Sequence, residues 1–470
     1  MTFLFTNKEK YYIVNEITKK YFGNKKFYKK FFEIALPVML ATLITNIVNF
    51  ADNLMVGNYS NVAVSAVYSA NQVTFVFNIL CFGIIGGAGI YIQQLYGAKK
   101  NKELQEVFHL KLYIMAALVL VDVPLIYVFG ENLIKLFSSY DTEGEAILIK
   151  SYSYLKIAIF SFIPFALTVC FSSTLREVGH TRIPVYSSIV SLVVNIVLNY
   201  LLIYGFDGFE AMGVEGAAIA TLTARSVECL ILVSITIYKK YTFIQNFFHT
   251  FFVNINLLKS ILIKTIPITA NELLWSLGMT FFAVAYSRRG DVLSALSIAS
   301  TTSELYVIII TGFGTGIGVM VGHELGKGNV SDAKENSLKL IVACAIAGLF
   351  IAVILAALST VVPLAFPKVT SEQKQLATYL ILDYASCCVF FSINFSIFVV
   401  LKSGGKAIES FLMDSTYTWV IAVPLAFVLT YFTDLPLILV YLLVQATDIP
   451  KMIIGIYFYK KGNWANDLVR

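Results

Sequence analysis

A single carboxylate lies within the first long apolar stretch of the chain, among polar neighbours at helical spacing. Residues 34–56 are almost entirely apolar, and Asp52 lies near their far end. Thr45, Asn49 and Asp52 follow the i, i+4, i+7 spacing that places side chains on one face of an α-helix. A charge at membrane depth costs about 2.5–3.5 kcal/mol on insertion scales unless it faces protein, ions or water. The spacing therefore predicts a functional site at Asp52. Thr45 and Asn49 also fit a hydrogen-bonded packing face, and Asn49 is a candidate for substrate binding.

Two later apolar stretches carry further oxygen donors. Asn195 and Asn199 lie one helical turn apart in residues 183–204, and Thr221 lies in the following stretch. Carboxylate, amide and hydroxyl oxygens are hard donors that suit Na⁺ or a hydrogen-bonded protonated acid. The sequence by itself leaves open whether the three stretches meet.

A second acid provides a candidate substrate site. Glu272 follows Pro267 by five residues in the seventh apolar stretch, and Trp275 lies one turn beyond it. An acid beside an aromatic ring can bind a lipophilic cation by charge and by cation–π contact. Glu272 fits a structural acid, hydrogen-bonded to helix ends, equally well. Gln72 and Glu304, in other apolar stretches, are weaker candidates for the same cleft.

Elements of membrane-spanning length must position these residues. The chain has 470 residues, of which 58% are hydrophobic and only 14% charged, as expected of a multi-pass membrane protein. At about 1.5 Å per residue, a helix of some 20 residues crosses a hydrocarbon core of roughly 30 Å. We predict an all-α fold with about twelve such spans, at 32–57, 66–95, 108–130, 151–175, 183–204, 214–238, 260–287, 293–325, 335–362, 373–401, 407–432 and 434–459.

The charge of the connecting loops predicts the orientation of the spans. Basic residues gather in alternate loops, among them Lys25–Lys30, Lys99, Lys100, Lys239 and Lys240, whereas loops such as SSYDTEGEA have none. Arg288 and Arg289 break the pattern. The bias predicts both termini in the cytoplasm. The expected domains are a cytoplasmic leader at 1–30, an N-lobe at 31–238, a cytoplasmic linker at 239–259, a C-lobe at 260–460 and a cytoplasmic tail at 461–470.

The two halves of the chain repeat each other. The segments SAVYSA and SALSIA, which begin at Ser65 and Ser294, lie 229 residues apart. The same offset aligns glycines, and a proline matches within one residue: Gly83 with Gly312, Gly87 with Gly316, Gly97 with Gly326, and Pro37 with Pro267. Two six-span halves that both start inside are parallel repeats, an architecture of transporters. Glycines spaced four apart favour close helix packing over a hinge.

Several classes of protein are excluded. All six cysteines lie in apolar runs without CxxC or metal spacing, and no GxxxxGK[ST] motif occurs. The spans contain no His or Cys nucleophile with a base, which excludes an acyltransferase. We expect no enzyme, no cofactor and no nucleic-acid partner. Arg225 and Glu228, three residues apart, are expected to neutralise each other or a neighbour. Lys156, Asp383 and Asp414 are candidates for pairing across helices, but the sequence assigns them no partners.

Motifs along nearly the whole chain carry a family resemblance. They are NFADNLMVG, QLYGAKK, VNIVLNYLLIYG, GVEGAAIAT, VGHELGKGN, LKSGGKA and TDIPKMIIGIYFYKKGNW. Together they resemble the bacterial branch of the multidrug and toxic compound extrusion (MATE) family, from about Phe31 to Trp464. The resemblance implies a two-lobe antiporter of twelve helices that expels organic cations.

The resemblance also implies roles for particular residues. The family's amino-terminal lobe holds an ion site built from an acid, two fifth-helix residues and a threonine, and the matching positions are Asp52, Asn195, Asn199 and Thr221. Some members have Asp at the position of Asn199, which leaves the coupling ion open between Na⁺ and H⁺. Many members carry the seventh-helix acid about one turn after Glu272.

We therefore predict secondary active efflux of amphipathic, cationic drugs by a monomer in the bacterial inner membrane. Ion entry at Asp52 would change the amino-terminal lobe and eject the substrate. The alternative is a lipid-linked oligosaccharide flippase of the wider superfamily. Such a protein would need a basic cleft for pyrophosphate, whereas the cleft candidates here, Asp52, Glu272 and Glu304, are acidic.

Overall fold

The computed structural model describes residues 19–135, 142–205, 210–245, 254–290, 292–366 and 369–469. Helices account for nearly all of this part, and none of it forms a strand. Within it, 12 helical segments are long and apolar enough to cross a membrane. The prediction of an all-α protein with about twelve spans is confirmed.

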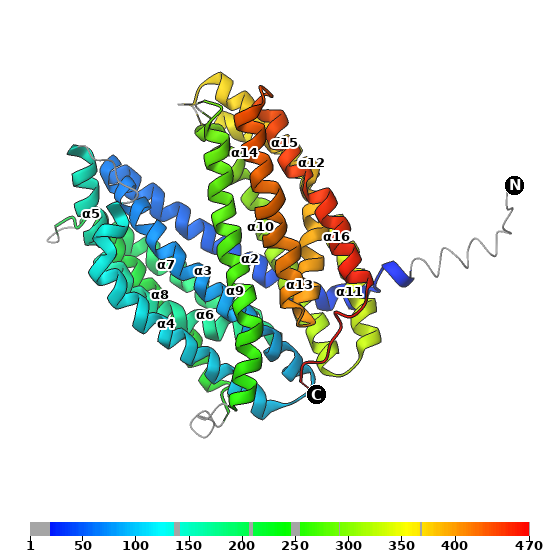
Figure 1. Cartoon of the computed structure of the whole chain (residues 1–470). Coiled ribbons are helices and arrows are strands. Elements are labelled where there is room, and N and C mark those ends of the chain that lie inside the picture. Colours follow the sequence, from blue (N-terminus) through cyan, green and yellow to red (C-terminus); the bar gives the residue numbers. More distant parts are fainter. Residues whose placement is uncertain are drawn as a thin grey trace, which may run out of the picture. The chain divides into compact units, whose positions relative to one another are not determined.

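The chain divides into two compact units (Figure 1). The N-terminal unit is Pro37–Leu273, and the C-terminal unit combines the residues up to Leu36 with Leu274–Arg470. Both boundaries fall inside a helix. Helix α2 (Lys25–Tyr59) begins in the C-terminal unit and continues into the N-terminal unit, whereas α9 (Ile255–Ser287) does the reverse. The first helix of each repeat is therefore shared between the units.

The N-terminal unit contains most of α2, the first part of α9 and the helices between them. Those helices are α3 (Asn61–Gly97), α4 (Asn101–Lys135), α5 (Thr142–Ala158), the 3₁₀ turn Ile159–Ser161, α6 (Phe162–Glu177), α7 (Arg182–Tyr204) and α8 (Val214–Tyr238). Helix α3 packs on α4, α5 and α6, and α8 packs on α5, α6 and α7 (Figure 1). Phe77 and Phe162 stack at 3.9 Å between ring centroids in the core.

Two glycines of α3 allow α9 to approach closely. A Cβ on Gly83 would lie 2.5 Å from the Cα of Thr269, and a Cβ on Gly87 would lie 2.5 Å from the Cα of Thr265. A side chain at either position would meet backbone, so these glycines serve helix packing.

The C-terminal unit contains the rest of α9 and the helices of the second repeat. They are α10 (Leu293–Gly326), α11 (Val330–Leu358), the 3₁₀ turn Val362–Ala365, α12 (Ser371–Ser403), α13 (Ala407–Phe411), two π-helical segments (Leu412–Thr416 and Thr418–Ala422), α14 (Val423–Phe432), α15 (Leu437–Ala446) and α16 (Asp448–Lys460). Helix α12 packs on α10, α11, α15 and α16. After α16, Trp464 is buried against Gly404 and stacks on Tyr459.

Candidate functional site

At one end of the N-terminal unit, helices α2 and α7 end and α8 begins. Close contacts join these three helix ends. The Tyr204 hydroxyl of α7 donates a hydrogen bond of 2.7 Å to the Met55 carbonyl of α2. A Cβ on Gly216 of α8 would lie 2.6 Å from the Leu202 carbonyl oxygen of α7, so only glycine permits this approach. Gly213, which precedes α8, adopts a positive φ of 56° that favours glycine. These contacts place the fifth and sixth spans beside the end of the first.

This arrangement joins Asp52 to the asparagine pair of α7. The Asn199 Nδ2 group donates a short hydrogen bond to Asp52 Oδ1 and a second one, of 3.2 Å, to Asn195 Oδ1. The Asn195 amide also lies within hydrogen-bonding reach of the Asp52 carboxylate. Asn195 and Asn199 are buried, and Asp52 is partly buried. The spacing of the two asparagines thus places both on the face of α7 that meets Asp52.

One oxygen of this cluster lacks a donor. Both N–H bonds of Asn199 are used, and its Oδ1 atom is buried without a hydrogen-bond partner. An ionised Asp52 requires this orientation, because the reversed amide would direct an oxygen at the carboxylate. A buried carbonyl oxygen without a donor costs about 1–3 kcal/mol, which a bound cation or proton donor would offset. The donor set therefore fits a hard monovalent cation or a protonated acid.

Thr221 is partly buried on α8, and Tyr154 of α5 connects it to the Asp52–Asn199 cluster. Its side chain lies within hydrogen-bonding reach of the buried Tyr154 hydroxyl, and Tyr154 lies within electrostatic range of Asp52. No hydrogen bond joins Thr221 directly to Asp52 in the described part of the chain. Tyr154 was missed by the sequence reasoning, because nothing local distinguishes it from the other aromatic residues of the spans.

Arg225 is a second residue whose importance the sequence did not indicate. It lies one turn beyond Thr221 on α8, within electrostatic range of both Asp52 and Glu228. Among the described residues it forms an ion pair with neither acid. Its Nη1 group donates a hydrogen bond of 3.3 Å to Ser161 Oγ, and its guanidinium lies 4.6 Å from the centre of the Phe165 ring. The i, i+4 spacing from Thr221 was the signal that could have identified it.

Glu228 is held by a hydroxyl and not by Arg225. Ser188 Oγ of α7 donates a hydrogen bond of 2.6 Å to Glu228 Oε1. The expectation was that Arg225 and Glu228 neutralise each other or a neighbour; among the described residues the two form no direct ion pair, although they lie within electrostatic range of each other. Arg176 of α6 is a further cation within electrostatic range of Glu228.

The other predicted site residues lie outside the Asp52–Asn199 cluster. Asn49 is exposed on α2, and Gln72 is partly buried on α3. The hydroxyl of Thr45 bonds the Ala41 carbonyl of its own helix. Glu272 is partly buried on the portion of α9 that belongs to the N-terminal unit.

Two predicted substrate-binding residues belong to the C-terminal unit. Trp275 is 49% exposed on α9, and Glu304 is exposed on α10. Close to Trp275, the indole N–H of Trp419 donates a hydrogen bond of 2.9 Å to the Leu274 carbonyl, which anchors the π-helical region to α9.

The C-terminal unit has an ionic cluster of its own. Lys451 of α16 lies 2.6 Å from Asp414 Oδ1 and 3.7 Å from Asp448 Oδ1. Asn394 of α12 donates hydrogen bonds to the Asp448 carboxylate at 2.8 Å and to its backbone carbonyl at 2.9 Å. Of the residues considered for pairing across helices, Asp414 does so, with Lys451 as its partner. Lys156 instead lies over the ring of Tyr152 on its own helix. Asp448 and Asn394 were missed, although the sequence DIPK places Asp448 and Lys451 at i, i+3.

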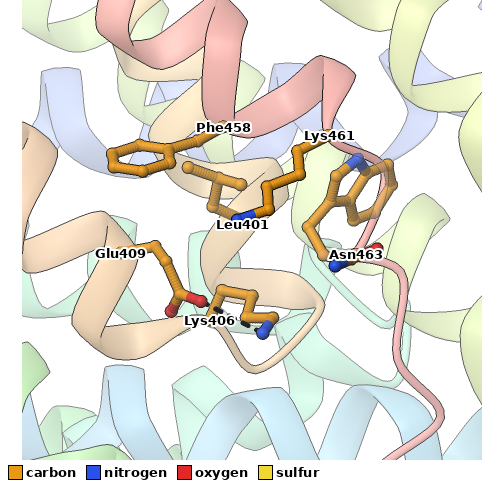
Figure 2. A pocket seen from close by; sticks show the side chains of 7 residues that line it. Leu401, Lys406, Glu409, Phe458, Lys461 and Asn463 are labelled. Carbon is orange, nitrogen blue, oxygen red and sulfur yellow. Dashed lines mark ion pairs between the residues drawn. The ribbon is translucent and has the colours of Figure 1, made fainter.

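A small pocket of the C-terminal unit contains none of the predicted site residues (Figure 2). Lys406 and Glu409 form an ion pair of 3.0 Å at its edge. The pocket is lined by Leu401, Lys406, Glu409, Phe458, Lys461, Asn463 and Trp464.

The described part of the chain contains no group of three or more His, Cys, Asp or Glu side chains that could hold a metal ion. All six cysteines are buried and free.

The twelve candidate spans of the described residues and the duplicated chain define a multi-pass membrane protein. The family model MatE matches the chain twice, at residues 37–201 and 267–432. The chain therefore belongs to the MATE family, whose members are transporters and not enzymes, as its motifs predict. The two matched segments begin at Pro37 and Pro267, the prolines that the internal repeat aligns.

Similar proteins match over most of their length. The chain is 25% identical over 447 residues to a "Probable multidrug resistance protein NorM" of Thermotoga maritima, covering 93% of each chain. It is 23% identical to the "Uncharacterized transporter YisQ" of Bacillus subtilis, covering 84% of this chain and 86% of that protein.

Solved structures share the fold. A crystal structure titled "MATE in the bent conformation" superimposes with a TM-score of 0.83 at 18% identity, covering 93% of this chain and 95% of that one. A structure titled "Outward-facing conformation of a multidrug resistance MATE family transporter of the MOP superfamily" gives a TM-score of 0.83 at 19% identity, covering 95% and 97%.

Proposed function

We propose that this protein is a secondary active multidrug efflux antiporter. It exports amphipathic, cationic compounds in exchange for one coupling cation, Na⁺ or H⁺, bound at Asp52. The observation that carries the proposal is the buried Asp52–Asn199–Asn195 cluster, in which Asn199 Oδ1 has no donor. Relatives named as multidrug resistance proteins support the substrate class.

Each residue of the site has a distinct role in this proposal. Asp52 provides the negative charge that attracts the cation. Asn199 orients the carboxylate through its N–H group and offers its Oδ1 atom to the ion, while Asn195 receives the second N–H bond that fixes this orientation. Thr221 supplies a hydroxyl beside Tyr154, which lies within electrostatic range of Asp52. Binding of a cation releases the cost of the unpaired oxygen and therefore favours the ion-bound arrangement of the N-terminal unit.

The membrane potential can contribute to the driving force. A unit charge that moves through 100 mV gains about 2.3 kcal/mol. We infer a monomer in the bacterial inner membrane, and the basic loops support a cytoplasmic position for both termini. Glu272, Trp275, Asn49, Gln72 and Glu304 remain candidates for contact with the substrate cation.

The test is transport by the purified protein in proteoliposomes with separately controlled Na⁺ and H⁺ gradients and ethidium as the substrate. Ethidium transport should follow one of the two gradients. Asp52→Asn, which preserves the shape of the side chain, should abolish gradient-driven transport while leaving thermal stability within about 1 kcal/mol. Transport that ignores both gradients, or normal transport by Asp52→Asn, would contradict the proposal and favour a flippase or an uncoupled role.

A further inference from the structure

Helices α2 and α7 are joined by two hydrogen bonds near the end that they share. The first is the bond from the Asn199 amide to Asp52. In the second, the Tyr204 hydroxyl donates to the Met55 carbonyl at 2.7 Å. Met55 follows Asp52 by three residues on α2, and Tyr204 follows Asn199 by five residues on α7. The second contact therefore lies roughly one turn beyond the acid–amide contact on both helices.

The direction and stiffness of the Tyr204 side chain explain how it reaches α2. Side chains of a helix lean toward its N-terminus, so a ring on the last residue extends back over the preceding turn. Tyr204 is the last residue of α7. A tyrosine has only two side-chain torsions to fix, so it holds its hydroxyl in place at a small entropic cost. The hydroxyl is thus a rigid donor aimed at the backbone of α2.

Residues just before α8 anchor the end of α7 from which Tyr204 extends. Met212 and Gly213 donate backbone hydrogen bonds to the carbonyls of Leu202 and Ile203, at 2.9 and 3.3 Å. A Cβ on Gly213 would lie 2.7 Å from the Tyr59 ring, so the last residue of α2 packs against the same segment. The end of α7 is therefore held independently of its hydrogen bond to α2.

The second contact determines how Asp52 is presented to α7. A single hydrogen bond constrains one distance and leaves the end of α2 able to rotate about it. Two contacts that are separated along both helices restrict rotation and sliding together. Any rotation of α2 that breaks the Met55 contact also moves Asp52, because three residues of one helix separate them. The Tyr204 bond thus belongs to the arrangement in which Asp52 meets Asn199, whose Oδ1 atom is buried without a donor.

We propose that Tyr204 is a positioning residue that holds the end of α2 in the arrangement that binds the coupling cation. This inference rests on the proposed antiport at Asp52. The apparent affinity for a cation rises with the population of the arrangement that binds it. The Tyr204 hydroxyl raises this population through a bond to backbone, so it acts through the position of α2 and does not ligate the cation.

The test measures cation affinity apart from transport. Purified full-length protein in detergent is heated across a series of Na⁺ concentrations and a series of pH values. The concentration of Na⁺ or H⁺ that gives half of the maximal thermal protection is read for each variant. Tyr204→Phe, which removes only the hydroxyl, should raise this concentration about two- to tenfold, the change in an equilibrium that one net hydrogen bond produces. In proteoliposomes this variant should raise the KM for the cation and leave kcat unchanged.

Tyr200→Phe is the matched control. Tyr200 lies one turn before Tyr204 on α7, and the centres of the two rings are 5.9 Å apart. Its hydroxyl forms no hydrogen bond with a described residue. Tyr200→Phe should therefore keep the wild-type half-saturating concentration. Unfolding of each variant without Na⁺ at high pH measures any general loss of stability.

The outcomes separate this inference from a structural role and from the proposed function. If Tyr204→Phe lowers stability or kcat but keeps the wild-type half-saturating concentration and KM, the positioning role is wrong, and the antiport stands if Asp52→Asn still abolishes transport. An equal shift from Tyr200→Phe would also overturn the inference, because the hydroxyl bond to Met55 would then not be the cause. If the wild type responds to neither Na⁺ nor H⁺, the proposed function fails and the inference fails with it.

Discussion

Both compact units hold an acid beside a buried asparagine, but they compensate the charge in different ways. In the C-terminal unit, Asp448 accepts from Asn394 and lies 3.7 Å from Lys451, which also pairs with Asp414 at 2.6 Å. In the N-terminal unit, Asp52 accepts from Asn199, and the neighbouring base forms no ion pair with it in the described structure. A tethered ammonium is thus part of the C-terminal cluster, whereas the N-terminal cluster is the one at which we propose that a coupling cation binds.

This difference in charge compensation suits the C-terminal cluster to stabilising the fold and the N-terminal cluster to exchanging a cation. An ion pair that is buried and satisfied stabilises the surrounding helices only while both partners remain, because loss of either leaves an uncompensated charge. An acid held by neutral amides can accept and release a cation without breaking a permanent ion pair. We therefore expect variants of the C-terminal cluster to affect folding and variants of the N-terminal cluster to affect transport.

The largest effect on stability is expected for Lys451→Met. This change leaves Asp414 and Asp448 without their base and should lower the free energy of unfolding by about 3–5 kcal/mol. Thermal unfolding in detergent, followed by size-exclusion chromatography, measures the loss. Lys135→Met is the control, because its pair with Glu131 is roughly half exposed and contributes about 0–1 kcal/mol. A Lys451→Met protein as stable as the control would show that the C-terminal cluster is not structural.

The next prediction contrasts Asn394 and Asn199, the asparagines that donate to an acid in each unit. Asn394→Leu removes both hydrogen bonds to Asp448 and should cost about 1–3 kcal/mol of stability. The concentration of Na⁺ or H⁺ that gives half of the maximal thermal protection should not change. Asn199→Leu removes the donor of Asp52 and the unpaired oxygen, so it should abolish cation-dependent thermal protection. The comparison fails if the two variants exchange these phenotypes.

Effects on stability of similar or smaller size are expected for the matched glycines of the repeat. Gly87→Ala places a methyl group 2.5 Å from the Thr265 Cα and should cost about 1–3 kcal/mol, because helix backbones must separate. Gly316→Ala meets the Phe31 ring at 2.5 Å and should cost less, since a side chain can shift. Thermal unfolding of both proteins measures the difference. Equal stability of Gly87→Ala and wild type would exclude the close helix contact.

Much of the fold follows from local pattern. The length and hydropathy of each apolar stretch predict twelve spans, because a helix must satisfy its backbone polar groups internally in the membrane. The repeat between Pro37 and Pro267 predicts two halves, and the family model matches both of them. The i, i+4 spacing of Asn195 and Asn199 also predicts their common face on α7.

The pairing of charged residues could not be predicted in the same way. Arg225 and Glu228 are adjacent on one helix face, yet their contacts come from Ser161 and Ser188 on other helices. Asp414 pairs with Lys451, which lies 37 residues later in the chain. Such partners depend on how helices pack, and local spacing contains no information about packing between distant segments.

The sequence alone determined the class of protein, its twelve spans, its duplication and the residue types available for an ion site, because these follow from composition and from periodicity within single helices. Only the tertiary structure decided that Asp52 meets Asn199 and that Lys451 is committed to Asp414. It also showed that α2 and α9 each contribute to both compact units. The physical reason is that a buried charge is stabilised by whichever groups the packing of helices brings within a few ångströms, and those groups come from segments far apart in the chain.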